Sequence, residues 1–288
     1  MIDWPDALVK DIARRRAIPF LGAGVSKNSV SELDANRRPP DWEEFLTAAL
    51  AECSGSKKHI RTLITQGDYL TACEVIKIKV GEHWNELVHT HFVEPRFLPA
   101  DIHRDIFKLD CRIVLTQNVD RIYDTFATNE SSGTVYVKEY SEADVAQVIR
   151  GDRRCVLKAH GTVNTPGEMV FTREEYAHAR HAYSGFYSLM DALTVTHTLL
   201  FIGCGVSDPD VQLMLERHAY AFSGRPHYMV TQQGALHADI VDSLRRNLNL
   251  RLLTYRGRDH HLELRESLAE LVAAVDAVRE ELARTRDW

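Results

Sequence analysis

Short apolar runs alternate with helical patterns over the second half of the chain. Runs typical of strands occupy residues 112–116, 135–140, 155–158, 198–202, 226–230 and 251–255, and those at 112–116 and 198–202 are typical of buried strands. Between them, apolar residues recur at helical spacing over residues 174–194, 208–222 and 237–248. Parallel strands need crossover connections, which helices usually supply. The alternation therefore predicts an α/β fold with a Rossmann-like, doubly wound parallel sheet.

The N-terminal pattern adds one more strand. A helical period over residues 7–13 is followed by the apolar run of residues 18–21, which breaks at Gly22. Residues 28–40 show no period, and we predict a loop there. Asp41 and Glu44 have the spacing of a capping box, which predicts the start of a helix at residue 42.

The segment after this helix start has a different character. From there to about residue 97, apolar residues follow helical periods and no strand is predicted. Pro95 and Pro99 close the segment, and a short helix over residues 102–109 leads into the next strand. We therefore expect residues 28–105 to form a helical insertion in a domain made of residues 1–27 and 106–288.

The chain ends in a predicted C-terminal helix. Its apolar residues recur every three or four positions from Leu264 to Leu282, with charged residues such as Arg265 and Glu270 between them. This apolar stripe can pack on the chain's own domain or on a second subunit. The first alternative is favoured, and both stay open.

Composition and charge narrow the class of protein. Hydrophobic residues make up 44% of the chain and charged residues 26%, which excludes a disordered chain. The formal net charge of −6 argues against a general binder of nucleic acid. Because the basic clusters, such as residues 14–16, are short and separated, we expect no direct contact with nucleic acid.

The sequence predicts neither a membrane segment nor secretion. No apolar run approaches the roughly 20 residues that span a bilayer, and the N-terminus lacks the basic start and apolar stretch of a signal peptide. The cysteines never pair at the spacing of a zinc or redox motif; they are Cys53, Cys73, Cys111, Cys155 and Cys204. We therefore expect a cytoplasmic protein whose thiols are mostly buried.

Four loops follow predicted strands, at the edge of the sheet where such folds bind ligands. The first loop holds Gly22, Ala23, Gly24 and Ser26, and its glycines would let backbone amides approach a pyrophosphate. Without a third glycine, the same pair is equally typical of a plain tight turn. This loop alone therefore does not decide between a nucleotide-binding site and a plain turn.

The second and third loops carry polar groups suited to chemistry. Gln117, Asn118 and Asp120 follow a buried strand, and either Asn118 or Asp120 can cap the helix that begins near residue 121. A cap needs only one such residue, whereas three hydrogen-bonding groups together suit a ribose and an amide. The third loop places His160 at a strand end, where an imidazole can act as a base near neutral pH.

The fourth loop contains Gly203, Gly205, Ser207 and Asp208. Asp208 stands before Pro209, and this pair is a strong helix-start signal that explains the aspartate without a ligand. A helix start does not explain the two glycines. They would allow a nucleotide to lie against the backbone.

Together the four loops resemble those of the sirtuin family of NAD-dependent enzymes. The order GAG-S, T-Q-N-x-D, K-x-H-G and a G-x-S type loop occurs between residue 18 and about residue 260. The resemblance implies phosphate contacts from Gly22, Ala23 and Ser26, nicotinamide ribose and carboxamide contacts from Asn118 and Asp120, a general base at His160, and adenosine contacts from Gly203 and Ser207.

The departures from the family pattern are also informative. Protein deacylases of this family carry two C-x-x-C pairs after the histidine loop, whereas only Cys155 and Cys204 lie near it here. We therefore expect no zinc module and no other metal site. The shielding Phe-Arg pair has no counterpart after Ser26, and the serine position of the fourth loop falls on Gly205. These features resemble the bacterial sirtuin-like branch that degrades NAD in anti-phage defence.

The resemblance implies an NAD hydrolase that releases nicotinamide and ADP-ribose. Cleavage passes through an oxocarbenium-like state, so the site must fix the leaving amide, stabilise positive charge and bring a nucleophile to C1′. Asn118 can orient a water, Asp120 can supply negative charge, and His160 can accept the proton. Two alternatives stay open: a sensor that binds NAD or ADP-ribose without turnover, and a residual deacylase or ADP-ribosyltransferase.

A hydrolase that was always active would drain the cell's NAD and cause abortive infection without a trigger. We therefore expect regulation through assembly, in a homo-oligomer with a separate activator protein. Relatives of this branch work with a HerA-type DNA translocase or an Argonaute. The resemblance favours the HerA-type partner for a short standalone chain.

Overall fold

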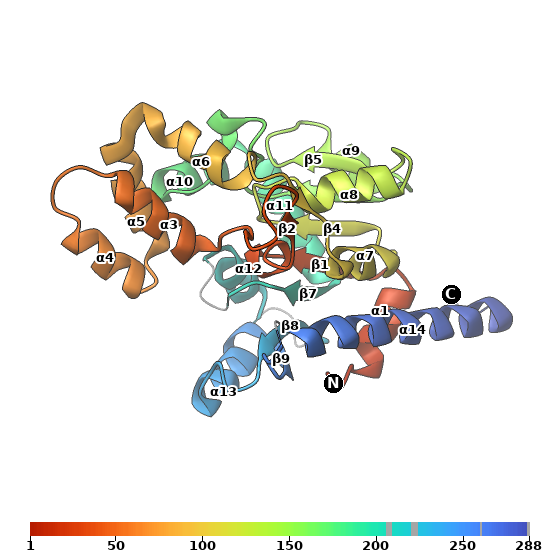
Figure 1. Ribbon diagram of the computed structural model, residues 1–288. Helices are drawn as coiled ribbons and strands as arrows, with labels where there is room; N and C mark the ends of the chain where they lie inside the picture. Colours follow the sequence, from red (N-terminus) through yellow and green to blue (C-terminus); the bar gives the residue numbers. More distant parts are fainter. Residues whose placement is uncertain (206–208, 220–223, 260, 287–288) are drawn as a thin grey trace.

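The computed structural model describes residues 1–205, 209–219, 224–259 and 261–286, and it contains a seven-stranded parallel sheet (Figure 1). The doubly wound α/β fold predicted from the sequence is confirmed. The strands are β1 (Ala17–Leu21), β4 (Ile113–Thr116), β5 (Tyr136–Glu139), β6 (Cys155–Lys158), β7 (Thr198–Ile202), β8 (His227–Gln232) and β9 (Leu250–Tyr255).

The strand order creates a crevice at the centre of the sheet. The order is β5-β6-β4-β1-β7-β8-β9, so β1 is paired with β4 on one side and with β7 on the other. The chain leaves β1 toward β4 and later returns to β7, which makes β1 the point where the winding direction reverses. Ligands in such folds bind outside the carboxyl ends of the strands at this point.

Helices cover both faces of the sheet because its central strands are apolar on both sides. In β1, Ala17 and Leu21 belong to one core, and Ile18 and Phe20 belong to the other. Helices that supply the first core are α1 (Asp6–Ala13), α7 (Asp101–Lys108), α8 (Ile122–Glu130) and α14 (Leu262–Thr285). Helices that supply the second are α9 (Val145–Arg150), α10 (Arg173–Ala182), α11 (Ser184–Thr196), α12 (Pro209–Ala219) and α13 (Ala238–Leu248).

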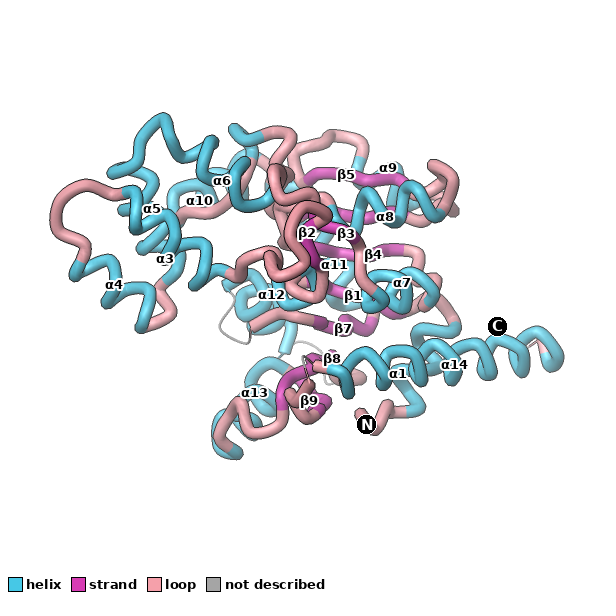
Figure 2. The backbone as a smooth tube through the Cα atoms, viewed as in Figure 1, coloured by secondary structure: helices cyan, strands magenta, loops and turns pink. Residues whose placement is uncertain are grey.

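A separate helical cluster lies beside the sheet (Figure 2). It consists of α3 (Trp42–Glu52), α4 (Lys58–Thr65), α5 (Tyr69–Val80), the 3-10 turn η1 (Gly81–His83) and α6 (Trp84–Phe92). Its own apolar core surrounds Phe45, which is fully buried. The capping box predicted for the first helix is confirmed, since Asp41 and Glu44 each accept the other's backbone N–H.

Some local predictions were wrong. Residues 30–31 and 97–98 form a short antiparallel pair, β2 (Val30–Ser31) and β3 (Phe97–Leu98), where no strand was predicted. Two-residue strands are too short to show an alternating pattern. Helix α9 was missed, and the helix predicted over residues 174–194 divides at Tyr183. Helix α7 supplies Ile102 and Ile106 to the core on one face of the sheet, and the domain boundary at residue 105 stays a prediction.

The C-terminal helix packs on the chain's own domain. Leu268, Leu271 and Val275 are fully buried, and α14 lies against α1 and α7. The guanidinium of Arg279 donates to the backbone carbonyl of Leu109 at 2.7 Å and so links α14 to the end of α7. In the part of the chain described, no helix has the length and apolar character needed to cross a membrane.

The burial of His103 predicts that the stability of the fold depends on pH. Its Nδ1 accepts the backbone N–H of Ala100 at the start of α7, and burial lowers the pKa of His103 to about 4. An unfolded histidine titrates near 6.5, so the stability from neutral His103 is present above that pH and is lost as the pH falls toward 4.

We expect His103→Gln to flatten this dependence. Glutamine can keep the bond to the Ala100 N–H but does not titrate. Between pH 7 and pH 5, the parent chain should lose roughly 1–2 kcal/mol more unfolding free energy than the variant. Urea unfolding at both pH values measures the difference, and an equal loss in the two proteins would contradict the prediction.

Candidate active site

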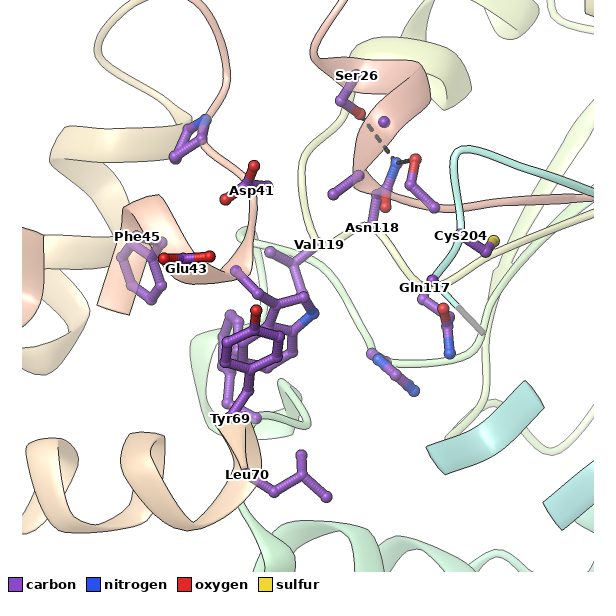
Figure 3. A pocket seen from close by; sticks show the side chains of 18 of the residues that line it. Ser26, Asp41, Glu43, Phe45, Tyr69, Leu70, Gln117, Asn118, Val119 and Cys204 are labelled. Atoms are coloured by element: carbon purple, nitrogen blue, oxygen red, sulfur yellow. Dashed lines mark hydrogen bonds between the residues drawn. The ribbon is translucent and has the colours of Figure 1, made fainter. Parts of the chain in front are cut away.

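A cavity of about 640 Å³ lies between the sheet and the helical cluster, at the carboxyl ends of β1, β4 and β7 (Figure 3). It collects most of the predicted site residues: Gly22, Ala23, Gly24, Ser26, Gln117, Asn118, Asp120, His160, Gly203 and Gly205. Ser207 and Asp208 lie outside the described residues. The structure thus brings four loops together around one cavity, while the role of each residue stays a prediction.

The loop after β4 is held against the loop after β1. The hydroxyl of Thr116 and the backbone N–H of Gln117 both donate to the carbonyl of Leu21 at 3.2 Å. The Asn118 amide donates to the carbonyl of Gly22 at 3.0 Å and to the Ser26 hydroxyl at 2.9 Å. These bonds fix the side chain of Asn118 at the cavity wall, as Figure 3 shows.

The orientation of the Asn118 amide follows from its partners. A backbone carbonyl can only accept, so the nitrogen of Asn118 must face Gly22. Both amide hydrogens are then used inside the protein. Among the described residues, nothing donates to the remaining oxygen, Oδ1. Asn118 therefore offers one hydrogen-bond acceptor to a ligand in the cavity.

The carboxylate of Asp120 is buried and both of its oxygens are engaged. One accepts the hydroxyl of Ser26 at 2.7 Å, and the other accepts the backbone N–H of Ile122 at 3.0 Å. Asp120 therefore binds the first backbone N–H of α8, next to the N-cap Arg121, and at the same time orients Ser26 and, through it, Asn118. The capping role and a role at the site are both compatible with this geometry.

Gly22 and Gly24, at the start of the one-turn helix α2 (Ala23–Ser26), pack against Gly203 of the loop after β7. A Cβ at Gly22 would lie 2.4 Å from the carbonyl oxygen of Gly203, and one at Gly24 would lie 2.8 Å from the Cα of Gly203. The backbone N–H of Gly24 already donates to the Gly203 carbonyl at 3.0 Å. These glycines are therefore required by the approach of two backbones, whatever the cavity holds.

His160 lies at the base of the cavity, after β6. Its side chain is buried, and its Nε2 is 3.1 Å from the hydroxyl of Tyr176 on α10. The two rings meet nearly edge to face, with their centroids 5.0 Å apart. Tyr176 carries no functional signal in the sequence, because a tyrosine inside a helical pattern is typical of core packing.

Lys158 is the second residue that the sequence analysis did not assign. Its ammonium group donates to the backbone carbonyls of Asn118 at 2.9 Å and Asp120 at 2.6 Å, and it lies 3.7 Å from the carboxylate of Asp124. The side chain is 1% exposed. Burial raises the pKa of Asp124 although Lys158 opposes this. The sequence feature that could have pointed to Lys158 is a charged residue at the end of a strand that is otherwise apolar and buried.

Aromatic side chains of the helical cluster form the opposite wall. The rings of Trp42 and Tyr69 are nearly parallel, with centroids 6.4 Å apart, and Phe171 meets Trp42 edge-on. In Figure 3, Tyr69 and Asp41 face Asn118 across the cavity. Lys27, which follows the first loop, forms ion pairs with Asp41 and Glu44 at the start of α3 and so connects the loop to this wall. Burial lowers the pKa of Lys27, but these carboxylates outweigh it and the net shift is upward.

The cysteines are dispersed through the structure. Cys53, Cys73, Cys111 and Cys155 are buried and free, which confirms the prediction of mostly buried thiols, and Cys204 is half-buried at the cavity. Across the described ranges, no three His, Cys, Asp or Glu side chains are grouped so that they could hold a metal ion.

Comparisons with known proteins give one family and several relatives. The family described as "SIR2-like domain" matches residues 112–253. NAD(+) hydrolase ThsA of Acinetobacter baumannii is 25% identical over 229 residues, which are 78% of this chain and 44% of that protein. Defense-associated sirtuin 2 of Bacillus subtilis is 27% identical over 199 residues, which are 68% of this chain and 18% of that protein.

A second ThsA, from Bacillus cereus, is 25% identical over 236 residues, 81% of this chain and 47% of that protein. The chain thus spans less than half the length of these curated relatives. A solved chain from work on the mechanism and regulation of Sir2 enzymes aligns with 96% of this chain and 100% of its own, at 14% identity and a TM-score of 0.46.

Replacing Lys158 should destabilise the protein strongly. In Lys158→Met, the carboxylate of Asp124 loses its buried partner and two backbone carbonyls lose a donor, so we expect a loss of about 3–5 kcal/mol in unfolding free energy. Lys138→Met is the control, because Lys138 pairs with Glu142 and Asp144 near the surface and should cost less than about 1 kcal/mol. Urea unfolding measures both losses. Similar losses in the two variants would refute a structural role for the buried Lys158 ammonium group.

Adding a methyl group at Gly22 should separate the two glycine loops. The new Cβ would meet the Gly203 carbonyl, and we expect Gly22→Ala to lose about 1–3 kcal/mol of unfolding free energy. Gly167→Ala is the matched control, since a Cβ there meets no atom within 4 Å. Thermal unfolding of both variants measures the loss. Unchanged stability of Gly22→Ala would show that the two loops can move apart without cost.

Proposed function

We propose that this chain, which carries a SIR2-like domain, is an NAD⁺ hydrolase that acts in anti-phage defence. NAD⁺ is its substrate, and nicotinamide and ADP-ribose are its products. The observation that carries the proposal is the fixed arrangement of Asn118, Ser26 and Asp120 in the same cavity as His160. Two of the relatives, an NAD(+) hydrolase and a defense-associated sirtuin, support it.

The reaction breaks one bond and forms one bond at the ribose C1′. The electron pair of the C1′–N bond goes to the nicotinamide ring, which leaves as a neutral molecule and needs no proton. The sugar passes through an oxocarbenium-like state that carries positive charge. Water adds to C1′ and releases one proton, so the site needs a proton acceptor and a source of negative potential.

The residues of the cavity can meet these needs. The free Oδ1 of Asn118 can accept a hydrogen bond from the attacking water or from a ribose hydroxyl. The Asp120 carboxylate supplies negative charge close by, in a buried position where charge acts strongly. His160 then accepts the proton from the water. The hydrogen bonds of Asn118 and Asp120 are already formed, so this part of the site is preorganised.

Control of the activity is a separate part of the proposal. Unrestricted hydrolysis would drain the cell's NAD⁺, so we propose that assembly with a partner protein, and of the chain with itself, sets when the site is active. A HerA-type DNA translocase as the partner, with an Argonaute as the second choice, stays a prediction. A search for the partner would begin with turnover measured in the presence and absence of each candidate.

The proposal predicts that the purified chain, alone or with a partner, releases nicotinamide from NAD⁺. His160→Ala and Asn118→Ala should each lower the rate by about 100-fold or more, because they remove the proton acceptor and the fixed acceptor group. The matched controls are His178→Ala and Asn129→Ala, two exposed positions on helices. Chromatography of nicotinamide measures the rate.

The outcomes separate the alternatives. Turnover that survives both site substitutions would overturn the proposed mechanism. Binding of NAD⁺ without turnover, with every partner tried, would instead favour a sensor. Release of nicotinamide only when an acylated peptide or an acceptor protein is added would favour deacylation or ADP-ribosyl transfer.

A further inference from the structure

We infer that Tyr176 is a positioning residue for His160, and that its hydroxyl sets the orientation and the tautomer of the histidine ring. The inference rests on the proposed function, which makes His160 the proton acceptor. Tyr176 does not need to touch the substrate in this role. It acts through the nitrogen of His160 that it contacts.

The contact has the geometry of a hydrogen bond shielded from water. The hydroxyl of Tyr176 lies 3.1 Å from Nε2 of His160, and the two side chains are 5% and 3% exposed. Their rings meet at an angle of 68° with centroids 5.0 Å apart, an edge-to-face contact that restricts rotation of the imidazole. Because little solvent reaches the pair, water does not compete well for the hydrogen bond.

The contact at Nε2 affects the whole imidazole ring of His160, because its two nitrogens share one proton in the neutral form. A neutral histidine has one nitrogen that donates and one that accepts, so a partner at Nε2 also determines the state of Nδ1. A hydroxyl that accepts from Nε2–H leaves Nδ1 basic, whereas one that donates to Nε2 leaves the proton on Nδ1. Orientation of a catalytic base by a third group is a recurring arrangement in enzymes.

Tyr176 is itself held from two sides. Its helix, α10, begins with a capping box between Thr172 and Glu175, and Ala179 packs on the core of the sheet. Glu175 also forms an ion pair with Lys77 of α5. The helical cluster thus contacts the start of α10 next to Tyr176 through this ion pair.

A second ion pair strengthens the same connection. Arg173 donates to the carboxylate of Asp68 at 2.8 Å and to the hydroxyl of Thr71 at 2.8 Å, both at the start of α5. The position of the tyrosine hydroxyl therefore depends on contacts with the sheet and with the helical cluster together. This support is what a residue that orients a base requires.

A purely structural role is the competing explanation, and Tyr140 provides the control for it. Tyr140 is also 5% exposed, belongs to the same core as Tyr176, and donates its hydroxyl to the carbonyl of Glu168 at 2.8 Å. It is not part of the cavity wall. Tyr140→Phe and Tyr176→Phe therefore remove equivalent hydroxyl groups, and only the second removes a contact with His160.

The first test needs no turnover. Nitrogen-15 NMR of the histidine rings follows the tautomer of His160, whose signal is identified by its loss in His160→Ala. We expect Tyr176→Phe to change the tautomer balance of the His160 ring, and Tyr140→Phe to leave it unchanged. An unchanged His160 signal in Tyr176→Phe overturns the inference.

The second test measures hydrolysis of NAD⁺. In Tyr176→Phe, kcat should fall about 10- to 100-fold, KM should stay within about twofold, and the acid limb of the pH profile should move. Tyr140→Phe should keep kcat and the pH profile even if it melts earlier. A Tyr176→Phe enzyme with the parent's kcat and profile overturns the inference. If the parent chain shows no turnover at all, the proposed function fails, and the NMR result still decides whether Tyr176 controls His160.

Discussion

The buried ammonium group of Lys158 holds two backbone carbonyls of the loop that carries Asn118 and Asp120. A lysine loses its hydration when it is buried, so it must find fixed acceptors. Here the acceptors are the loop itself, and the loop is thereby bound to the end of β6, next to His160. The bonds from Asn118 and Asp120 to Ser26 extend this order to the first glycine loop. The shape of the cavity wall depends on this one charge.

The cavity also depends on how two parts of the chain meet. The sheet supplies backbone loops and polar side chains, whereas the helical cluster supplies Trp42, Tyr69 and the ion pairs to α10. Helix α10 contacts both parts, because Ala179 packs on the sheet core and Glu175 pairs with the cluster. A change in the position of the cluster would therefore alter the support of Tyr176 and its contact with His160.

Sequence patterns found the long elements and missed the short ones. The central strands of the sheet are predicted because buried parallel strands are continuous apolar runs, and the edge strands β5 and β9 because each keeps a short apolar segment between helical patterns. Strands β2 and β3 have two residues each and are held by pairing between distant segments, which no local pattern records. Asp120 shows the same limit at the site, because its sequence context suggests either a cap or a ligand group. In the structure one oxygen of its carboxylate accepts the first backbone N–H of α8 and the other accepts the hydroxyl of Ser26.

By itself, the sequence determined the alternation of strands and helices, the four loops at strand ends and the lack of paired cysteines, because these follow from local periodicity and spacing. Only the tertiary structure decided that Lys158 supports Asn118 and Asp120, that Gly22 and Gly24 meet Gly203, and that Tyr176 contacts His160. Each of these contacts joins segments that are distant in the chain or lie on different elements. Their energies depend on burial and on distances of a few ångströms, which residue order does not contain.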